Sequence, residues 1–354
     1  MIVLSDAAQR EVDDALEVAL SRLRKRAASL GESAAALGEA TAAAAAGGKR
    51  LRPALVIAAF EAFGGDCAHA PGLWRVAAAF ELLHAAFVVH DDLIDGDVER
   101  RGVPNVMGAF RQRARALGGD ARDERTLGDA AAVLAGDLLL FEATRLIATA
   151  PVPAPARAGL FVLLDDALLV SAAGELADVE QAIGESLPPT ASLLRTARDK
   201  TAFYSFQAPL SAGALLAGAA EAQRSAVEAA GSEIGIAFQL ADDLIGTFGS
   251  RAQAGREPGA DLRAAKRTPL ISLAAETALW PRVASALALA PTGPIAVREA
   301  QRELAASGAR ERTVELIEDT QRSARTRAAD AALPRDAVVL LAALAAAVEE
   351  RIPR

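Results

Sequence analysis

Apolar residues recur with helical spacing along almost the whole chain, and most of them are alanine and leucine, which are strong helix formers. Hydrophobic residues make up 52% of the 354 residues, but aromatic residues only 4%. We find no convincing stretch of the alternating apolar and polar residues that is typical of a half-buried strand. The pattern predicts an all-α protein with one domain over residues 1–354, in which ten or more helices surround a central cavity.

Glycines, prolines and runs of charge indicate where these helices end. The charged, glycine-containing stretch 111–125 is predicted to be a loop. The predicted helices cover about 6–30, 32–46, 53–63, 71–97, 126–149, 156–184, 190–219, 222–249, 267–289, 296–306, 309–331 and 336–350. The breaks between them are short, which favours a single packed domain.

Charge and cysteine content exclude several kinds of protein. The chain has 38 basic and 46 acidic residues, a net charge of −8, so we expect no nucleic-acid partner. The single Cys67 excludes an internal disulfide and fits a cytoplasmic location. The first residues lack the pattern of a signal peptide. The uncharged run 338–348 is too short to cross a bilayer, so we expect no integral membrane span.

Two acidic motifs end long apolar segments: DDLID at 91–95 and DDLIG at 242–246. On a helix Asp91 and Asp95 share one face, about one turn apart. Carboxylates beside apolar surface need a cation or hydrogen bonds to compensate them. Oxygen ligands favour Mg²⁺, which completes its coordination shell with water and substrate phosphate. The motifs therefore indicate an enzyme that acts on a diphosphate.

Basic clusters accompany the acidic motifs. Alone, GGKRLRP at 47–53 is more simply a helix stop with a solvated basic turn. The triplet DKT at 199–201 is more simply a solvated ion pair, and the isolated Asp261 and Lys266 are more often surface charges. Together, two basic and two acidic clusters at helix ends favour a phosphate site, because their coincidence in an acidic chain is improbable.

As a set, these motifs resemble the trans-prenyl diphosphate synthases, the polyprenyl synthetase family. The matching segments, which cover about 45 to 270, are GGKRLRP (47–53), ELLHAAFVVHDDLIDGDVERRG (81–102), DKT (199–201), FQLADDL (238–244) and KRTP (266–269). The resemblance implies an isoprenoid synthase-type all-α fold, a homodimer, and Mg²⁺ as cofactor, with three ions once diphosphate is bound. It implies head-to-tail condensation of isopentenyl diphosphate with dimethylallyl, geranyl or farnesyl diphosphate.

The resemblance also implies roles for individual residues. Those that match Mg²⁺ ligands are Asp91, Asp95 and Asp242. Supporting carboxylates are Asp92 and Asp243, of which Asp243 also counts among the substrate-binding residues. Cations for the allylic diphosphate are Arg100, Lys200 and Lys266. Residues that hold isopentenyl diphosphate are Lys49, Arg52, His84 and Arg101. Polar groups near the developing allylic cation are Thr201 and Gln239. Lys200, Thr201 and Gln239 join the three ligands as the predicted catalytic set.

Product length is predicted to depend on the helix before the first acidic motif. Phe87 lies one turn before Asp91, Ala86 is beside it, and Leu83 is one turn deeper. In the resembling family a bulky aromatic pair at the first two of these places typically stops growth at farnesyl diphosphate (C15). Ala86 is small, which favours geranylgeranyl diphosphate (C20), with farnesyl diphosphate as the second choice.

Two positions depart from the family pattern: Gly246 replaces the last aspartate of the second motif, and Arg256 stands where many members have lysine. Two alternatives therefore stay open. A terpene cyclase-like relative would not need GGKRLRP and Arg101. A catalytically silent regulatory subunit would not need both acidic pairs, although Gly246 is compatible with it.

Overall fold

Helices account for nearly all the regular structure of the computed structural model, which describes residues 2–100, 102–184, 186–254, 257–330 and 333–353. The all-α prediction is confirmed; over these residues the strands are one two-residue pair. The chain forms two compact units. The N-terminal unit comprises residues 3–162 and 215–217, and the C-terminal unit comprises 1–2, 163–214 and 218–354. A single domain around a central cavity stays a prediction.

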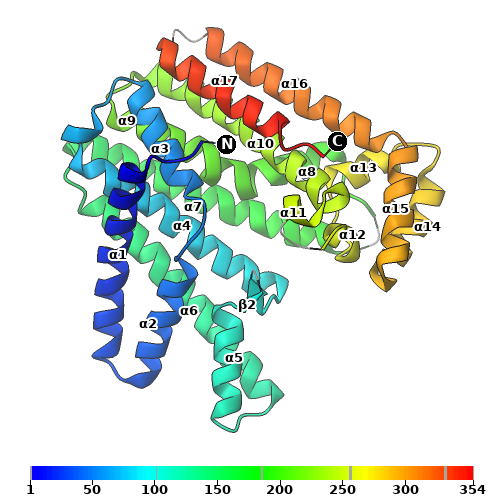
Figure 1. Ribbon diagram of the computed structural model, residues 1–354, viewed down its shortest axis with the longest axis horizontal. Helices are drawn as coiled ribbons and strands as arrows, with labels where there is room; N and C mark the ends of the chain where they lie inside the picture. The colour runs from blue at the N-terminus through cyan, green and yellow to red at the C-terminus, as the bar shows by residue number, and fades with distance from the viewer. Residues whose placement is uncertain (1, 101, 185, 255–256, 331–332, 354) are drawn as a thin grey trace. The chain divides into compact units, whose positions relative to one another are not determined.

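The N-terminal unit is built around one apolar helix, α4 (Figure 1). Its elements are α1 (Asp6–Ala28), α2 (Glu32–Ala44), α3 (Leu51–Ala62), η1 (Cys67–His69), α4 (Pro71–Asp95), β1 (Glu99–Arg100), β2 (Val103–Pro104), α5 (Val106–Ala116), α6 (Ala121–Ala148) and the beginning of α7 (Ala154–Ala182). α4 packs mainly on α6, with Phe80, Leu82 and Leu83 fully buried. By length and hydropathy α4 could cross a membrane, but 72% of its most apolar window is buried, as in a core helix.

Residues 111–125 are not the predicted loop. α5 continues to Ala116, and α6 begins at Ala121 behind a capping box made by Asp120 and Asp123. α5 is amphipathic: Phe110 and Ala114 are buried, and its charges occupy the outer face. The charge run therefore marks the exposed sides of two helices, with only a short turn between them.

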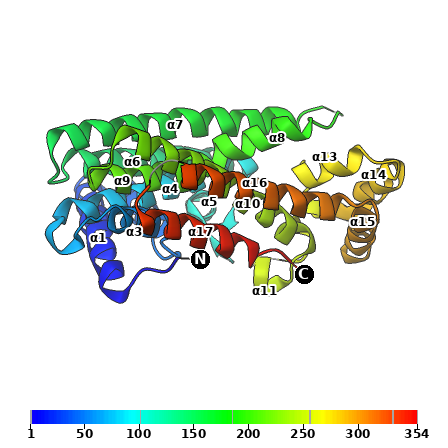
Figure 2. The same cartoon turned by 90° about the horizontal axis from the view of Figure 1, so that it is seen from above.

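The C-terminal unit surrounds α10, which packs against η2, α16 and α17. Its elements, after the rest of α7, are α8 (Thr190–Ala197), the π-helical η2 (Arg198–Gln207), α9 (Ala208–Leu216), α10 (Glu221–Phe248), α11 (Arg251–Ala254), α12 (Ala260–Arg263), α13 (Pro269–Ala275), α14 (Trp280–Leu289), η3 (Ala290–Thr292), α15 (Pro294–Ala306), α16 (Ala309–Asp330) and α17 (Arg335–Glu349). Figure 2 shows α16 and α17 running side by side.

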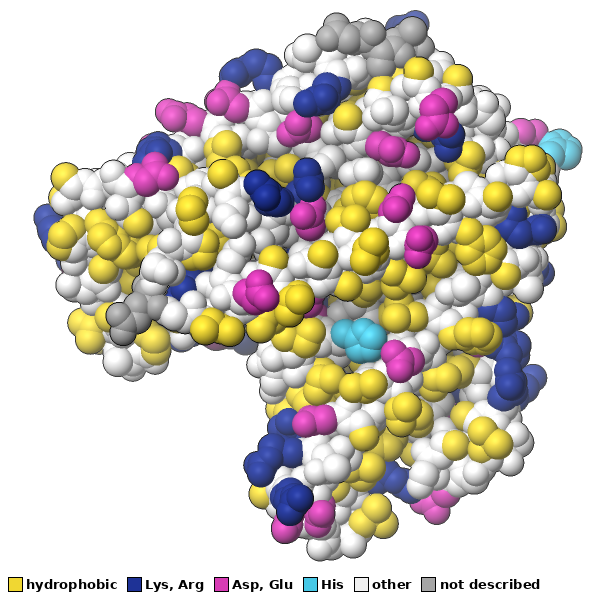
Figure 3. All heavy atoms as spheres, turned by 180° about the vertical axis from the view of Figure 1, so that it is seen from behind, with side chains coloured by type: hydrophobic (Ala, Val, Ile, Leu, Met, Phe, Trp, Pro, Cys, Tyr) yellow, Lys and Arg dark blue, Asp and Glu magenta, His cyan; other side chains and the backbone are white. Residues whose placement is uncertain are grey.

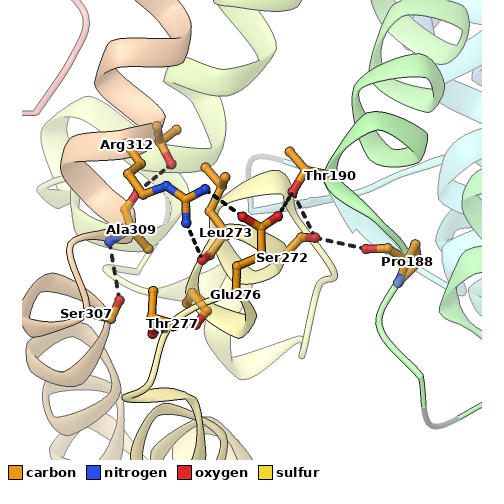
Figure 4. Close-up of polar contacts among 11 residues, drawn as sticks. Pro188, Thr190, Ser272, Leu273, Glu276, Thr277, Ser307, Ala309 and Arg312 are labelled. Atoms are coloured by element: carbon orange, nitrogen blue, oxygen red, sulfur yellow. Dashed lines mark hydrogen bonds and ion pairs between the residues drawn. The ribbon is translucent and has the colours of Figure 1, made fainter.

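The predicted helix 267–289 is in fact two helices, α13 and α14, and polar contacts hold the end of the first (Figure 4). Arg312 of α16 binds the Glu276 carboxylate at 2.6 Å and the Leu273 carbonyl at 3.1 Å. The Thr190 hydroxyl donates to Ser272 Oγ at 3.0 Å. These contacts satisfy groups at the end of α13, where the chain turns.

Candidate active site

The predicted site residues fall into two groups, one in each unit. The group in the N-terminal unit comprises Lys49, Arg52, Leu83, His84, Ala86, Phe87, Asp91, Asp92, Asp95 and Arg100. The group in the C-terminal unit comprises Lys200, Thr201, Gln239, Asp242, Asp243 and Lys266. Arg101 and Arg256 lie outside the described residues.

The basic loop before α3 is held by Arg50, which was not among the predicted site residues. Its backbone is left-handed, with φ +52°, and its buried side chain bonds to Glu81 Oε1 at 3.1 Å and Asp13 Oδ1 at 3.0 Å. Lys49 next to it is exposed, and Arg52 is half-buried in the first turn of α3. Arg50 therefore anchors the loop from inside, while its neighbour Lys49 faces solvent.

The end of α4 presents carboxylates of two kinds. Asp91 is half-buried and Asp95 is exposed. Asp92 is buried and accepts hydrogen bonds from Arg100 Nη1 at 2.5 Å and Asn105 Nδ2 at 3.1 Å. Burial raises the pKa of Asp92, and the charge of Arg100 opposes that rise. Asp92 therefore ties α4 to the hairpin that follows it, and α4 ends at Gly96, whose φ of +75° suits a glycine cap.

A cavity of about 300 Å³ joins several of these residues within the N-terminal unit. Its polar lining includes Gly48, His84, Asp92 and Arg100. Glu81 and Asn105 also line it, and most of the remaining wall is apolar and comes from α2, α4 and α5. The two glycines of the basic loop, His84, Asp92 and Arg100 thus line one cavity, whereas Lys49, Arg52, Asp91 and Asp95 are not among its lining residues.

The second acidic motif lies at the end of α10, and more of the acidic side chains around it are buried than the sequence predicted. Asp243 is buried and accepts a hydrogen bond from Gln239 Nε2 at 3.2 Å. Burial, and then the charge of Asp261, raise the pKa of Asp243 to about 8. Asp261 on α12 is 4% exposed, so its assignment as a surface charge was wrong. The charges of Asp261 and Asp242 therefore favour a positive charge beside Asp243, which is a proton when no cation is bound.

Lys200 lies on the π-helical segment η2 beside two acidic residues of α7. Its Nζ is 3.0 Å from Glu175 and 2.7 Å from Asp178, and Thr201 follows it, half-buried. Gly174 permits this contact, because a Cβ there would lie 2.2 Å from the backbone nitrogen of Lys200. π-Helical turns are frequent at functional sites. The signal for the α7 residues was the sequence GELAD at 174–178, which places two carboxylates one turn apart.

Lys266 is exposed, and its charge lowers the raised pKa of Asp243. It follows Ala265, whose backbone is left-handed with φ +52°. Among the described residues Arg50 and Ala265 are the only ones other than glycine with positive φ. Each adjoins a lysine that was predicted to bind diphosphate, and such strained backbone is concentrated at functional sites.

The donor groups fit Mg²⁺. Over the described residues no three His, Cys, Asp or Glu side chains form a closed metal cage. Mg²⁺ does not require one, since it is bound through one or two carboxylates together with water and substrate phosphate. Asp91 and Asp95 are one turn apart on α4, and Asp242 is half-buried beside the buried Asp243, so each unit offers such a pair.

Residues 35–288 match the family model described as polyprenyl synthetase. The chain belongs to the polyprenyl synthetase family. It is 31% identical over 227 residues to the geranylgeranyl diphosphate synthase of Sulfolobus acidocaldarius. Over 224 residues it is 37% identical to the (2E,6E)-farnesyl diphosphate synthase of Mycobacterium bovis.

These two alignments cover 64% and 62% of this chain, and 62% and 55% of the relatives' own lengths. A solved structure is similar over more of the chain. It is the geranylgeranyl pyrophosphate synthase from Corynebacterium glutamicum, complexed with isoprenyl diphosphate and magnesium. That structure has a TM-score of 0.87 and is 30% identical, and the match covers 98% of this chain and 100% of the other. The predicted family and the isoprenoid synthase-type fold are therefore confirmed.

Proposed function

We propose that the protein is an Mg²⁺-dependent prenyltransferase that condenses isopentenyl diphosphate head-to-tail with an allylic diphosphate. The observation that carries this proposal is that a cation accompanies the acidic motif in each unit: Arg100 binds Asp92 of the first motif, and the charge of Lys266 acts on Asp243 of the second. The structural relative that binds isoprenyl diphosphate and magnesium supports it.

In this proposal the chain's own residues bind two diphosphates differently. Lys49, Arg52, His84 and Arg101 hold isopentenyl diphosphate. Arg100, Lys200 and Lys266 hold the allylic diphosphate. Mg²⁺ bound by Asp91, Asp95 and Asp242, as three ions, would neutralise the leaving pyrophosphate.

The reaction breaks the allylic C–O bond and forms a C–C bond from the double bond of isopentenyl diphosphate. Thr201 and Gln239 stabilise the developing allylic charge, and apolar surroundings exclude water. The proton lost from isopentenyl diphosphate passes to the departing pyrophosphate, the strongest base at such a site. Proximity of the two substrates supplies much of the rate.

We propose geranylgeranyl diphosphate as the main product, and farnesyl diphosphate as the second choice. Ala86 and Leu83 are fully buried in α4, whereas Phe87 is half-buried. In this proposal the small side chain of Ala86, where an aromatic residue would end growth at C15, allows one more isoprene unit beside Phe87. The relatives include synthases named for each product.

We also propose a cytoplasmic homodimer. α6 exposes Val133, Leu134 and Phe141, whose exposed fractions are 44%, 51% and 57%. Hydrophobic side chains also reach the surface over much of the face in Figure 3. Phe141→Glu should produce monomers in size-exclusion chromatography with light scattering, whereas Leu117→Glu, at an exposed turn, should not. An unchanged mass for the Phe141 variant would reject this surface as the interface.

The substrate preference is tested with purified protein, Mg²⁺, labelled isopentenyl diphosphate and each of the three allylic primers. We expect chromatography to show a labelled C20 diphosphate. A cyclic hydrocarbon formed from the primer without label would favour a cyclase. No reaction with any primer, but restored product when a partner synthase is added, would favour a regulatory subunit.

A further inference from the structure

The turn after α17 places a guanidinium directly on the second acidic motif. Arg351 Nη2 forms an ion pair with Asp242 Oδ1. The same guanidinium lies over the ring of Phe238, 4.2 Å from its centroid. Phe238 precedes Asp242 by one helical turn on α10, so one side chain covers both.

Other contacts hold this turn in place. Arg310 of α16 donates a hydrogen bond to the Pro353 carbonyl at 2.8 Å, and its guanidinium lies 5.2 Å from the centroid of the Phe248 ring. Pro353 is buried. The Phe238 ring is itself packed on Phe206, with their centroids 5.1 Å apart. These contacts therefore hold the turn so that Arg351 lies beside Asp242.

The charges explain why a cation is needed there. Asp242 adjoins the buried Asp243 on α10, and Asp261 on α12, which packs against α10, is also buried. The charge of Asp242 is more favourable beside these acidic side chains when a cation is paired with it. Arg351 supplies one positive charge where the proposed function places a divalent ion.

The Arg351–Asp242 pair is also one that a divalent ion can displace. The side chains are 26% and 44% exposed, and ion pairs open to water are weak. The Nε of Arg351 is buried without a hydrogen-bond partner, so the guanidinium is only partly satisfied in this position.

We propose that Arg351 is a positioning residue for Asp242 that occupies the place of the metal charge and leaves when the metal binds. This inference rests on the proposed function, because it takes Asp242 to be a metal ligand. Arg351 would keep the carboxylate neutralised and oriented in the metal-free protein, at the expense of metal affinity.

The direct test is Mn²⁺ affinity, with Mn²⁺ in place of Mg²⁺, from the electron paramagnetic resonance signal of the free ion. Arg351→Ala should bind Mn²⁺ about two- to fivefold more tightly than wild type, the scale of an exposed ion pair. Loss of a merely structural side chain would weaken binding or leave it unchanged. Arg351→Lys keeps the charge without the planar fork, so its affinity should lie between the two.

A matched control is Arg325→Ala. Arg325 binds Glu349 at the end of α17 at 2.6 Å, so this variant removes a guanidinium contact near the same turn but leaves Asp242 paired. Its Mn²⁺ affinity should equal that of wild type. Arg310→Ala, which releases Pro353, should raise Mn²⁺ affinity without removing Arg351, and this second variant keeps the test open if Arg351→Ala folds poorly.

Hydrogen exchange gives an independent readout. Mg²⁺ with inorganic pyrophosphate should increase amide exchange in a peptide covering 349–352 of the wild type, because the turn is released. Equal or weaker Mn²⁺ affinity in Arg351→Ala, or unchanged exchange on metal binding, would overturn the inference. Product formation is measured separately. If the wild type forms product but Arg351→Ala binds Mn²⁺ with unaltered affinity, only the role of Arg351 is rejected. If Arg351→Ala binds Mn²⁺ more tightly but the wild type forms no product from any primer, only the proposed reaction is rejected.

Discussion

Asp243 shows at the scale of one residue how burial and neighbouring charges alter a carboxyl of the second acidic motif. Its carboxyl is buried at the end of α10 and lies near the charges of Asp261 and Asp242. The side-chain amide of Gln239 opposes the resulting rise in its pKa only partly. Without metal, the group therefore holds its proton to about pH 8.

The raised pKa of Asp243 predicts how stability depends on pH. The folded protein binds this proton more tightly than the unfolded chain, whose carboxyl has the ordinary pKa of 3.8. The stabilisation that comes from protonating Asp243 is therefore fully present below about pH 4 and is lost as the pH rises to about 8. Over this range the free energy of unfolding falls by at most about 1.4 kcal/mol per pH unit. Asp243→Asn should flatten this fall in urea unfolding of the metal-free protein.

The control for this measurement is Asp319→Asn, which removes an exposed carboxylate that pairs with Arg322 in the same helix turn. It should leave the pH slope unchanged between pH 5 and 8. If Asp243→Asn shows the wild-type slope there, the proposed burial of a protonated carboxyl at this position is wrong.

Asp91 and Asp242 are the two single residues on which the proposed metal binding depends most. Replacing either by alanine should lower turnover by at least about 100-fold, the scale of removing one preorganised electrostatic group. Asp97→Ala, an exposed carboxylate just past α4, should keep wild-type turnover. Near-full activity in either Asp91→Ala or Asp242→Ala would refute the metal assignment for that residue.

The sequence predicts where the carboxylates lie along the helices, but not which side chains surround them. The helical spacing of 91–95 and 242–246 was enough to place both motifs at helix ends. It could not show that Asp261 is buried or that Arg50 pairs with Glu81, because those contacts join segments far apart in the chain. Burial of a charge depends on its neighbours in space, and a single sequence does not give them.

The contact between α7 and η2 is the clearest feature at the scale of elements. A helix of ordinary geometry was predicted through 190–219, but residues 198–207 are π-helical. This segment carries Lys200 towards Glu175 and Asp178 on α7. The absence of a side chain at Gly174 is what allows the two backbones to approach.

Gly174→Ala should therefore destabilise the protein by about 1–3 kcal/mol, as overpacking does, despite the better helix propensity of alanine. The added Cβ would meet rigid backbone at Lys200. Gly159→Ala is the control on the same helix, since its Cβ would meet the movable Leu215 side chain at 2.9 Å, and it should be close to neutral. Urea unfolding compares the two, and equal stability would contradict the close contact at Gly174.

α4 carries the prediction about product length. Phe87→Ala should lengthen the main product by at least one isoprene unit, because it removes a ring one turn before Asp91. Phe110→Ala removes a similar ring from the buried face of α5, so it should lower stability comparably and leave product length unchanged. Chromatography of the dephosphorylated products decides, and an unchanged distribution for Phe87→Ala would refute its role as pocket floor.

At the scale of the whole molecule, composition and periodicity predicted the fold class, because alanine and leucine spacing dominates every long segment. Element boundaries failed at 111–125 and 267–289. At 111–125, the charged residues on the exposed sides of α5 and α6 gave a sequence pattern like that of a loop. At 267–289, the turn after α13 is held by contacts of Glu276 with residues distant in the sequence. The division of packing into two units has no counterpart in composition or in a linker.

The most direct test of the central claim is metal-dependent chain elongation by the whole protein. Chelator-treated enzyme, labelled isopentenyl diphosphate and geranyl or farnesyl diphosphate are combined, and Mg²⁺ is then added back in steps. We predict no labelled prenyl product before Mg²⁺ is added, and afterwards a labelled product that rises with Mg²⁺ and is mainly C20. Label incorporated equally without divalent metal, or no labelled product at saturating Mg²⁺ with either primer, would contradict it.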